Sequence, residues 1–179
     1  MAYYRPVFRT QKPPEDPTEP WGNEGRSVGD SHAWNGCVAY SGAMALDYET
    51  KGRKKLWGGK IRHSLANPNG RRPGPTLGLD DLQDAWRRLG YFLDDRSGQG
   101  WAGVIRAHKD GRAIVLQGRG DCPGKGTYKG PHAAIWLPDG AWGDPLTNRW
   151  QKVERSAIRR WAEAWNSNIN FAVTRARNP

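Results

Sequence analysis

The sequence predicts an α+β protein in which helices come first and a β-sheet follows. Three patterns indicate it: a run of small and apolar residues typical of a buried helix near residue 43, an amphipathic segment near residue 85, and short apolar, β-branched runs bounded by glycine in the second half. One further helix is inserted among the strands. This order of elements is an α+β arrangement.

The chain is long enough for one domain with a sizeable core. It has 179 residues, and ten Trp against three Phe, with 23 Gly and 13 Pro, indicate a compact, loop-rich domain with aromatic anchors. Residues 1–30 carry Pro13, Pro14, Pro17 and Pro20 among Glu, Asp and Gly, which favours an extended arm or linker. Residues 31–179 are then the folded domain.

The first half of this domain is predicted to hold two helices. Residues 37–51 are mostly small or apolar, so other elements can pack closely on them, and Gly52 suits the C-terminal cap. Residues 79–89 place their apolar side chains on one face, with acids in the first turn, arginines in the last and Gly90 as the stop. The stretch 66–78 between them is predicted to be a loop.

The second half is predicted to supply the sheet. A short helix over residues 99–111 ends at a glycine and leads into an apolar strand over residues 112–118. After a glycine-rich loop, a second strand covers residues 131–140. A helix over residues 156–166 and an alternating strand over residues 169–176 complete the domain.

Charge and cysteine content limit the functional classes. The net charge is +10, from 28 Lys and Arg against 18 Asp and Glu, which favours a polyanionic partner such as nucleic acid, a cell-wall polymer or an acidic protein. The charges are scattered and no nucleic-acid motif accompanies them, so solubility explains the charge equally well and nucleic acid is the least favoured partner. Two cysteines and four scattered histidines offer no zinc-ligand spacing, so neither a metal nor another cofactor is expected.

Two further segments bear on localisation. The chain has no run of about 18 apolar residues that would span a membrane. The first ten residues, MAYYRPVFRT, lack the apolar core of a signal peptide. Neither a membrane span nor ordinary secretion is therefore expected.

The candidate nucleophile is Cys37, at the start of the first predicted helix. A thiol is a good nucleophile at neutral pH only when its pKa is lowered, and the dipole and free backbone N–H groups of a helix N-terminus lower it. A neighbouring imidazolium lowers it further. A histidine from far along the chain is therefore expected beside Cys37.

His132 is the candidate base, and Asp144 is the residue that would orient it. His132 opens an apolar strand directly after Gly130 and Pro131, and Asp144 follows twelve residues later, the length of a hairpin. A carboxylate there would hold the tautomer of the ring and steady the imidazolium, as in nucleophile–base–acid triads. From spacing alone, a buried structural cysteine and a surface histidine are the stronger interpretation.

Longer segments resemble a known family. The cysteine that opens a small-residue helix, followed by WAGVIRAHKDGRAIVLQG (101–118) and GPHAAIWLPDGAWGDPL (130–146), resembles papain-like cysteine peptidases of the bacteriocin-processing, C39-like type. GCVAYSGAMALDYETKG (36–52), with LQG and DPL, also resembles peptidase-like structural or lytic proteins of tailed phages that infect actinobacteria. The resemblance covers residues 30–176.

This resemblance implies a papain-like fold, in which the N-terminal nucleophile helix packs on an antiparallel sheet. It also implies roles for three residues. Cys37 would be the nucleophile, His132 the general base and acid, and Asp144 the residue that orients His132.

The family also has a glutamine a few residues before the cysteine, which donates to the oxyanion. The matching stretch here, DSHAWNG (30–36), has none. Asn35 or the backbone N–H of Cys37 could substitute, because the site needs only donors aimed at the developing charge. Gln117 is another polar group that could face the cleft, although a glutamine at a sheet end is more often structural.

The leading hypothesis is a phage-encoded cysteine peptidase or amidase. It would cleave an amide bond of peptidoglycan or of a phage structural protein through a thioester intermediate, in the virion or in the host cytoplasm during assembly. The alternative is a catalytically silent papain-like component of a phage tail or head, which would use its arm and Trp-rich surface for assembly. Cys122, placed in a flexible loop, would be an incidental thiol or an oxidative partner of Cys37.

Overall fold

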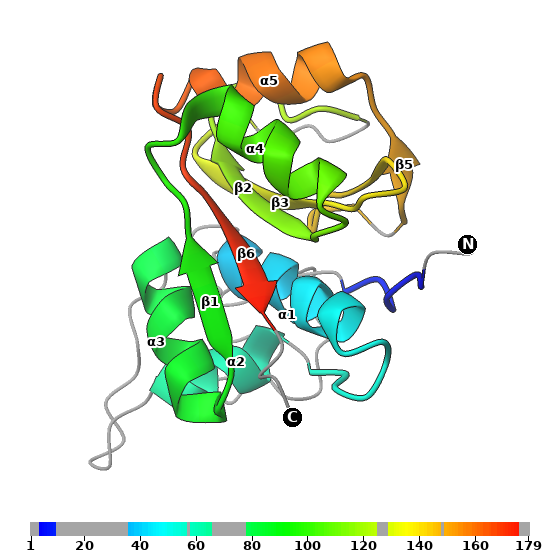
Figure 1. Ribbon diagram of the computed structural model, residues 1–179, viewed down its shortest axis with the longest axis vertical. Coiled ribbons are helices and arrows are strands. Elements are labelled where there is room, and N and C mark those ends of the chain that lie inside the picture. Colours follow the sequence, from blue (N-terminus) through cyan, green and yellow to red (C-terminus); the bar gives the residue numbers. More distant parts are fainter. Residues whose placement is uncertain are drawn as a thin grey trace, which may run out of the picture.

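The protein folds with its elements in the predicted order. The computed structural model describes residues 4–9, 36–56, 58–65, 78–124, 129–147 and 149–175. Most of the predicted arm and residues 66–77 of the predicted loop lie outside these ranges. The elements, shown in Figure 1, are α1 (Cys37–Glu49), α2 (Gly58–Leu65), α3 (Leu79–Leu89), β1 (Phe92–Asp95), α4 (Gly100–Lys109), β2 (Ile114–Gly118), β3 (His132–Trp136), β4 (Ala141–Gly143), β5 (Gln151–Lys152), α5 (Arg155–Glu163) and β6 (Phe171–Arg175).

The strands form one six-stranded sheet in the order β1-β6-β2-β3-β4-β5. Every neighbouring pair is antiparallel. All predicted helices and strands occur within a few residues of their expected bounds, whereas α2 and the edge strands β1 and β5 were not predicted. The predicted α+β class, with helices before an antiparallel sheet, is confirmed.

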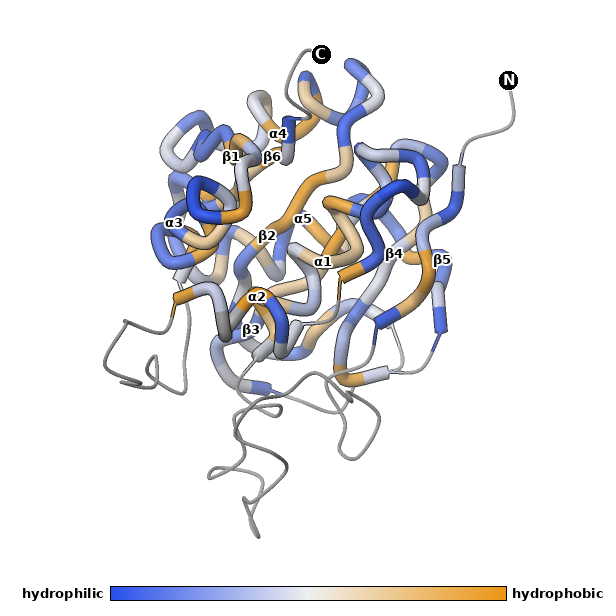
Figure 2. Tube along the Cα trace, turned by 90° about the horizontal axis from the view of Figure 1, so that it is seen from below, coloured by the Kyte–Doolittle hydropathy of each residue, from blue (hydrophilic) through white to orange (hydrophobic). Residues whose placement is uncertain are grey.

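The sheet separates two apolar clusters. Helix α1 lies against one face of β2 and β3, and helices α4 and α5 lie against the other face (Figure 1). Alternate residues of β2 divide between the two: Val115 packs with α1, while Ile114 and Leu116 pack with α4 and α5. In Figure 2 the apolar segments accordingly gather along β2, β6 and α1 inside the molecule.

Helix α1 is the central buried helix, as its small residues predicted. Gly42 lets α3 pack closely on it, because a Cβ atom there would lie 2.5 Å from Leu82 Cδ1. The helix ends at Glu49 with Thr50 as its C-terminal cap, two residues before the predicted Gly52. Gly52 lies in the turn that follows, in the left-handed region (φ +82°), and its N–H donates to the Asp47 carbonyl at 3.0 Å. Close packing in the middle of α1 and the closed turn after it fix the position of the helix, and with it the position of its first residue.

The described part of the N-terminal arm, residues 4–9, has no helix or strand but is bound to the domain. The Val7 N–H donates to Asp47 Oδ2 at 2.7 Å, and the Trp150 indole N–H donates to the Pro6 carbonyl at 3.3 Å. Phe8 also meets the Trp150 ring edge-on, with 5.4 Å between ring centroids. These six residues therefore link the end of α1 to the segment just before β5.

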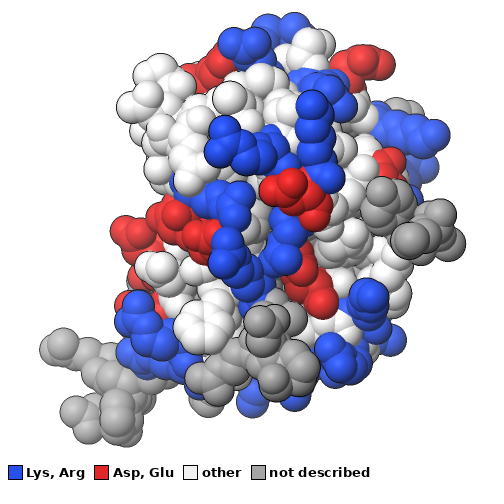
Figure 3. Space-filling view, in the orientation of Figure 1, with Lys and Arg blue, Asp and Glu red and all other residues white. Residues whose placement is uncertain are grey.

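Charges of both signs are mixed on the face shown in Figure 3. Some charges of the described residues form ion pairs: Arg112 contacts Glu49, and both Arg96 and Arg175 contact Asp94. The excess of basic residues is thus interrupted by acids on this face, in line with the scattered pattern of the sequence. None of the described helices combines the length and apolar character needed to cross a membrane.

Candidate active site

Cys37 is the first residue of α1. Gly36 caps the helix, and the Tyr40 N–H donates to the Gly36 carbonyl at 3.0 Å, which closes the first turn around Cys37. The thiol is partly exposed, unlike the fully buried residues that follow it. Backbone N–H groups in the first turn have no acceptor within the helix, so they favour negative charge on the Cys37 sulfur.

His132 is brought to Cys37 by the packing of β3 on α1. Ser41 lies one turn after Cys37, and its buried hydroxyl donates to the Ala133 carbonyl at 3.3 Å. Ala133 directly follows His132, which opens β3 opposite Gly118 of β2. The helix turn that carries the thiol and the strand residue that carries the imidazole are therefore joined by a buried hydrogen bond.

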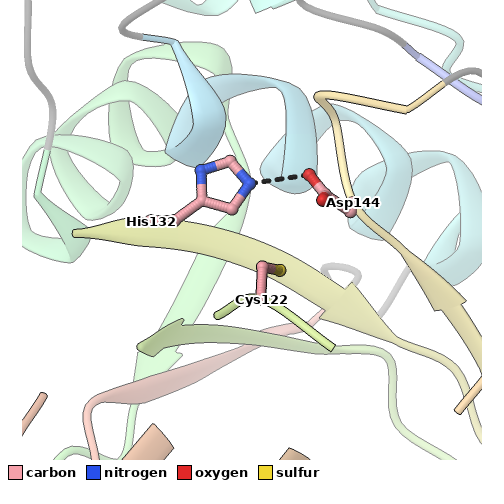
Figure 4. Close-up of side chains that lie close together, drawn as sticks. All are labelled: Cys122, His132 and Asp144. Carbon is pink, nitrogen blue, oxygen red and sulfur yellow. Dashed lines mark hydrogen bonds and ion pairs between the residues drawn. The ribbon is translucent and has the colours of Figure 1, made fainter. Parts of the chain in front are cut away.

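Asp144 follows β4 and lies against the imidazole ring, as Figure 4 shows. His132 Nε2 is 2.7 Å from Asp144 Oδ1, and both side chains are almost completely buried. The same carboxylate oxygen accepts the Leu146 N–H at 2.9 Å, and the Asp144 carbonyl accepts the Thr147 N–H at 2.8 Å. The tight turn after Asp144 thus fixes the carboxylate toward the ring.

The Cys37 thiol forms a hydrogen bond with His132. Because Nε2 is bonded to Asp144, Nδ1 is the ring nitrogen available to the sulfur. Burial alone would raise the pKa of Cys37, but the hydrogen bond and charge of His132, with backbone hydrogen bonds from Ala133 and Val38, outweigh it and lower the pKa below its ordinary value.

The pKa of His132 moves in the opposite direction. Burial would lower it, but hydrogen bonds to Asp144 and Cys37, and the negative charges of both partners, raise the pKa to about 9. Opposite shifts in two bonded groups favour a thiolate–imidazolium pair. Such a pair is the reactive form of a nucleophilic cysteine.

Cys122 also lies close to the His–Asp pair (Figure 4), which the sequence did not predict. Far from being an incidental thiol in a flexible loop, it is 3% exposed and packs in the apolar cluster with Trp142 and Trp161. Both Cys37 and Cys122 are free thiols. Burial, followed by the charge and hydrogen bond of Asp144, raises the pKa of Cys122.

The two further candidates from the sequence have different outcomes. Asn35 lies outside the described residues. The Gln117 side chain, on β2, accepts a hydrogen bond from the Asn170 amide at 3.4 Å. This contact joins Gln117 to the residue before β6, and its role at the cleft stays a prediction.

Cys122, His132 and Asp144 also form the kind of group that can bind a metal ion. Their ligand atoms lie within 4.8 Å of one another, and thiolate, imidazole and carboxylate all bind Zn²⁺. However, tetrahedral Zn²⁺ with bonds of about 2.0–2.1 Å keeps its N and O ligands roughly 3.3 Å apart. His132 Nε2 and Asp144 Oδ1 are 2.7 Å apart. The group is thus arranged for mutual hydrogen bonds rather than for a metal.

Comparison with known proteins identifies the fold. No protein-family model and no curated protein matches the sequence. A solved structure from Bacillus anthracis, described as a C39-like peptidase, has a TM-score of 0.54 to this chain, covering 78% of this chain and 88% of its own at 16% identity. The protein therefore has the α+β, papain-like fold of C39-like peptidases, as the sequence predicted. At this identity the likeness establishes the fold alone.

Proposed function

We propose that the protein is a cysteine peptidase or amidase. One observation carries the proposal: a partly exposed thiol at a helix start is hydrogen bonded to an imidazole, and that imidazole is bonded to a buried carboxylate. This is the geometry of a nucleophile, a base and an orienting acid. The papain-like fold, with Cys37 at the start of the helix that packs on the antiparallel sheet, supports the proposal.

In the proposed reaction the Cys37 thiolate attacks the carbonyl carbon of the substrate amide. First-turn N–H groups of α1 stabilise the oxyanion, and the His132 imidazolium gives its proton to the leaving amine. Water, deprotonated by His132, then attacks the thioester and releases the acid and the thiol. Asp144 holds the ring and stabilises its charged form throughout both steps.

The pH dependence of Cys37 alkylation tests the proposal directly. In a Cys122→Ser variant Cys37 is the single thiol, so iodoacetamide reports its ionisation alone. We expect the alkylation pKa to lie well below the free value of about 8.5, and to return to it in a His132→Ala background. An ordinary pKa that does not depend on His132 would contradict the proposal, as would turnover by a folded Cys37→Ala variant.

The proposed substrates are peptides of actinobacterial peptidoglycan or a structural protein of the phage that would encode the chain. The net charge of +10 and the resemblance of GCVAYSGAMALDYETKG (36–52) to phage peptidase-like proteins support this choice. A zymogram with actinobacterial cell walls should show clearing by the wild type and none by Cys37→Ala. Lack of clearing at every pH would leave the structural protein as the proposed substrate.

A catalytically silent component of a virion is the second candidate. It is favoured by the missing glutamine before Cys37. A normal, His132-independent Cys37 thiol would move this candidate to first place. Binding of nucleic acid ranks third, and DNA binding that is absent or insensitive to salt would remove it.

A further inference from the structure

We infer that Trp161 of α5 is a positioning residue of this site. Its indole fills the space where Gly118 lacks a side chain, next to His132, and so fixes the direction in which the imidazole points. That direction keeps the ring bonded to Asp144. The effect on turnover rests on the proposed function. The packing itself does not, and it is tested separately below.

Gly118, the last residue of β2, leaves the space that the indole occupies. A Cβ atom on Gly118 would lie only 2.1 Å from Trp161 Cδ2 and 2.3 Å from Trp161 Cε2, far closer than side chains pack in proteins. The backbone of Gly118 does not adopt a positive φ, so its conformation does not require a glycine. The glycine is therefore needed at this position for the close approach of Trp161.

This space lies directly beside the His132 side chain. Gly118 and His132 are opposite each other in the antiparallel ladder of β2 and β3. Side chains of opposite residues point to the same face of a sheet, with about 4.5–5.5 Å between their Cβ atoms. The Trp161 ring therefore takes the cross-strand position next to the imidazole and closes that side to it.

The same indole also packs on the strand that leads to Asp144. Trp161 meets Trp142 of β4 edge-on, with 5.4 Å between the ring centroids and 89° between the ring planes. Trp142 is fully buried and lies two residues before Asp144. One rigid ring thus packs against both strand ends that carry the His132–Asp144 pair, whose bonded atoms are 2.7 Å apart.

The backbone of Trp161 is attached to the same strand end. The Arg119 N–H, one residue after Gly118, donates to the Trp161 carbonyl at 3.1 Å. Helix α5 lies on the face of the sheet opposite to α1 (Figure 1), and Trp161 is only 3% exposed. The ring and the backbone of one residue are therefore both fixed to the end of β2, and a positioning role needs such rigidity.

The size of the ring, and not its N–H group, accounts for the contact. The Trp161 indole N–H is buried without a hydrogen-bond partner among the described residues. A buried donor without an acceptor destabilises a fold, and a phenylalanine would not have this cost. The contribution of Trp161 is therefore the width of the indole, which fills the space between Gly118 and Trp142.

NMR of isotope-labelled histidine tests the packing without any activity. The pH titration of the His132 ring reports its bond to Asp144, because the carboxylate favours the charged ring. We expect Trp161→Ala to lower the pKa of His132 by about one unit or more, and Trp161→Phe, which keeps part of the ring, to lower it less. An unchanged His132 titration in a folded Trp161→Ala protein would overturn the inference.

Trp86→Ala is the matched control. Trp86 is also fully buried, has an indole N–H without a partner among the described residues, and packs on a glycine, Gly42, but in the apolar cluster on the α1 face. Both alanine variants should lower the free energy of unfolding, whereas only Trp161→Ala should shift the titration of His132. An equal shift in both variants would reflect a general loss of packing and would overturn the inference.

A side chain at position 118 tests the space itself, and it decides the question even if Trp161→Ala folds poorly. Gly118→Val alone should disrupt the site, because its Cβ atom would meet the indole at 2.1 Å. In the Trp161→Ala background the same substitution should restore part of the His132 titration and of the stability, because the valine fills the space that the indole leaves. Equal damage by Gly118→Val in both backgrounds would overturn the inference.

Turnover connects the inference to the proposed function. For Trp161→Ala we expect kcat to fall about 10- to 100-fold with KM within about twofold of wild type, because a misdirected imidazole impairs proton transfer rather than substrate binding. A rise in KM at constant kcat would overturn the positioning role. An ordinary, His132-independent Cys37 thiol in the wild type would overturn only the proposed peptidase function, and a shifted His132 titration in Trp161→Ala would still support the inference.

Discussion

The two cysteines both lie close to the His132–Asp144 pair, and their pKa values shift in opposite directions. Cys37 is partly exposed at a helix start and bonds to the imidazole, which lowers its pKa. Cys122 is buried in the cluster with Trp142 and Trp161 close to the carboxylate, and burial raises its pKa. The sign of the neighbouring charge and access to water thus decide which thiol is reactive, not the residue type.

The comparison also shows how one ion pair can serve two purposes. In the proposed ion pair the His132 imidazolium stabilises the Cys37 thiolate, while the negative charge of Asp144 and burial raise the pKa of Cys122. A change in the His–Asp pair should therefore affect both cysteines, in opposite directions. The predictions below use this opposition, from the largest expected effect to the smallest.

The largest predicted difference is in alkylation of the native protein. At neutral pH iodoacetamide should modify Cys37 and leave Cys122 intact, with rates that differ by at least about 10³-fold, because thiolate population changes tenfold per pKa unit and Cys122 is also inaccessible. Peptide mass mapping after brief treatment measures both sites. In denaturant the two rates should converge. Fast modification of Cys122 in the folded protein would contradict its placement.

Replacement of Asp144 by Asn should narrow the pH range of activity. The pKa of His132, raised to about 9, should fall toward its ordinary value because the carboxylate charge is lost. The alkaline limb of the kcat/KM profile should then move down by at least about one pH unit, with a loss of roughly 10²-fold or more at its former optimum.

The matched control is Asp139→Asn, because Asp139 lies in the turn between β3 and β4 but pairs with Arg5 rather than with His132. That variant should keep the alkaline limb of the wild type. If the alkaline limb of the kcat/KM profile were unchanged in Asp144→Asn, the Asp144 carboxylate would not control the pKa of His132.

The alkaline stability of the fold should depend on Cys122. Its folded pKa is raised, so its contribution to the free energy of unfolding is fully present below the unfolded pKa of about 8.5 and is lost as the pH rises above it. Between about pH 8.5 and 10 the wild type should lose about 1.4 kcal/mol per pH unit more than Cys122→Ala, the effect of one proton. Urea unfolding at several pH values measures this, and parallel curves would contradict it.

The long, patterned elements of the fold were predictable from the sequence, and the short ones were not. Helix α3 has acids in its first turn, arginines in its last and Gly90 in the left-handed conformation, so local signals define it fully. Strands β1 and β5 have four and two residues, and they exist because β6 and β4 supply their partners. Tertiary pairing of this kind has no local sequence signal.

The same distinction applies to the site. The three predicted site residues each lie at the end of a regular element: Cys37 at the start of α1, His132 at the start of β3 and Asp144 directly after β4. A helix start and the length of a hairpin can both be inferred from the sequence, so these positions were predictable. Cys122 stands in a segment rich in glycine and proline, which local composition assigns to a flexible loop. Its burial comes from contact with Trp142, a residue twenty positions away on β4. The sequence signal that could have identified Cys122 is its residue type, because the chain has only two cysteines.

The smallest predicted effect concerns the hydrogen bond that joins α1 to β3. Ser41→Ala removes a buried hydroxyl and leaves the Ala133 carbonyl without that donor, so the free energy of unfolding should fall by about 1–2 kcal/mol. Ser64→Ala is the control: its hydroxyl donates to the Ile61 carbonyl within α2, remote from the thiol. If this bond positions Cys37 against His132, its loss should raise the alkylation pKa of Cys37 slightly, while Ser64→Ala should leave that pKa unchanged. A stability loss without any change in Cys37 reactivity would mean that helix packing alone, and not this bond, brings the thiol to the imidazole.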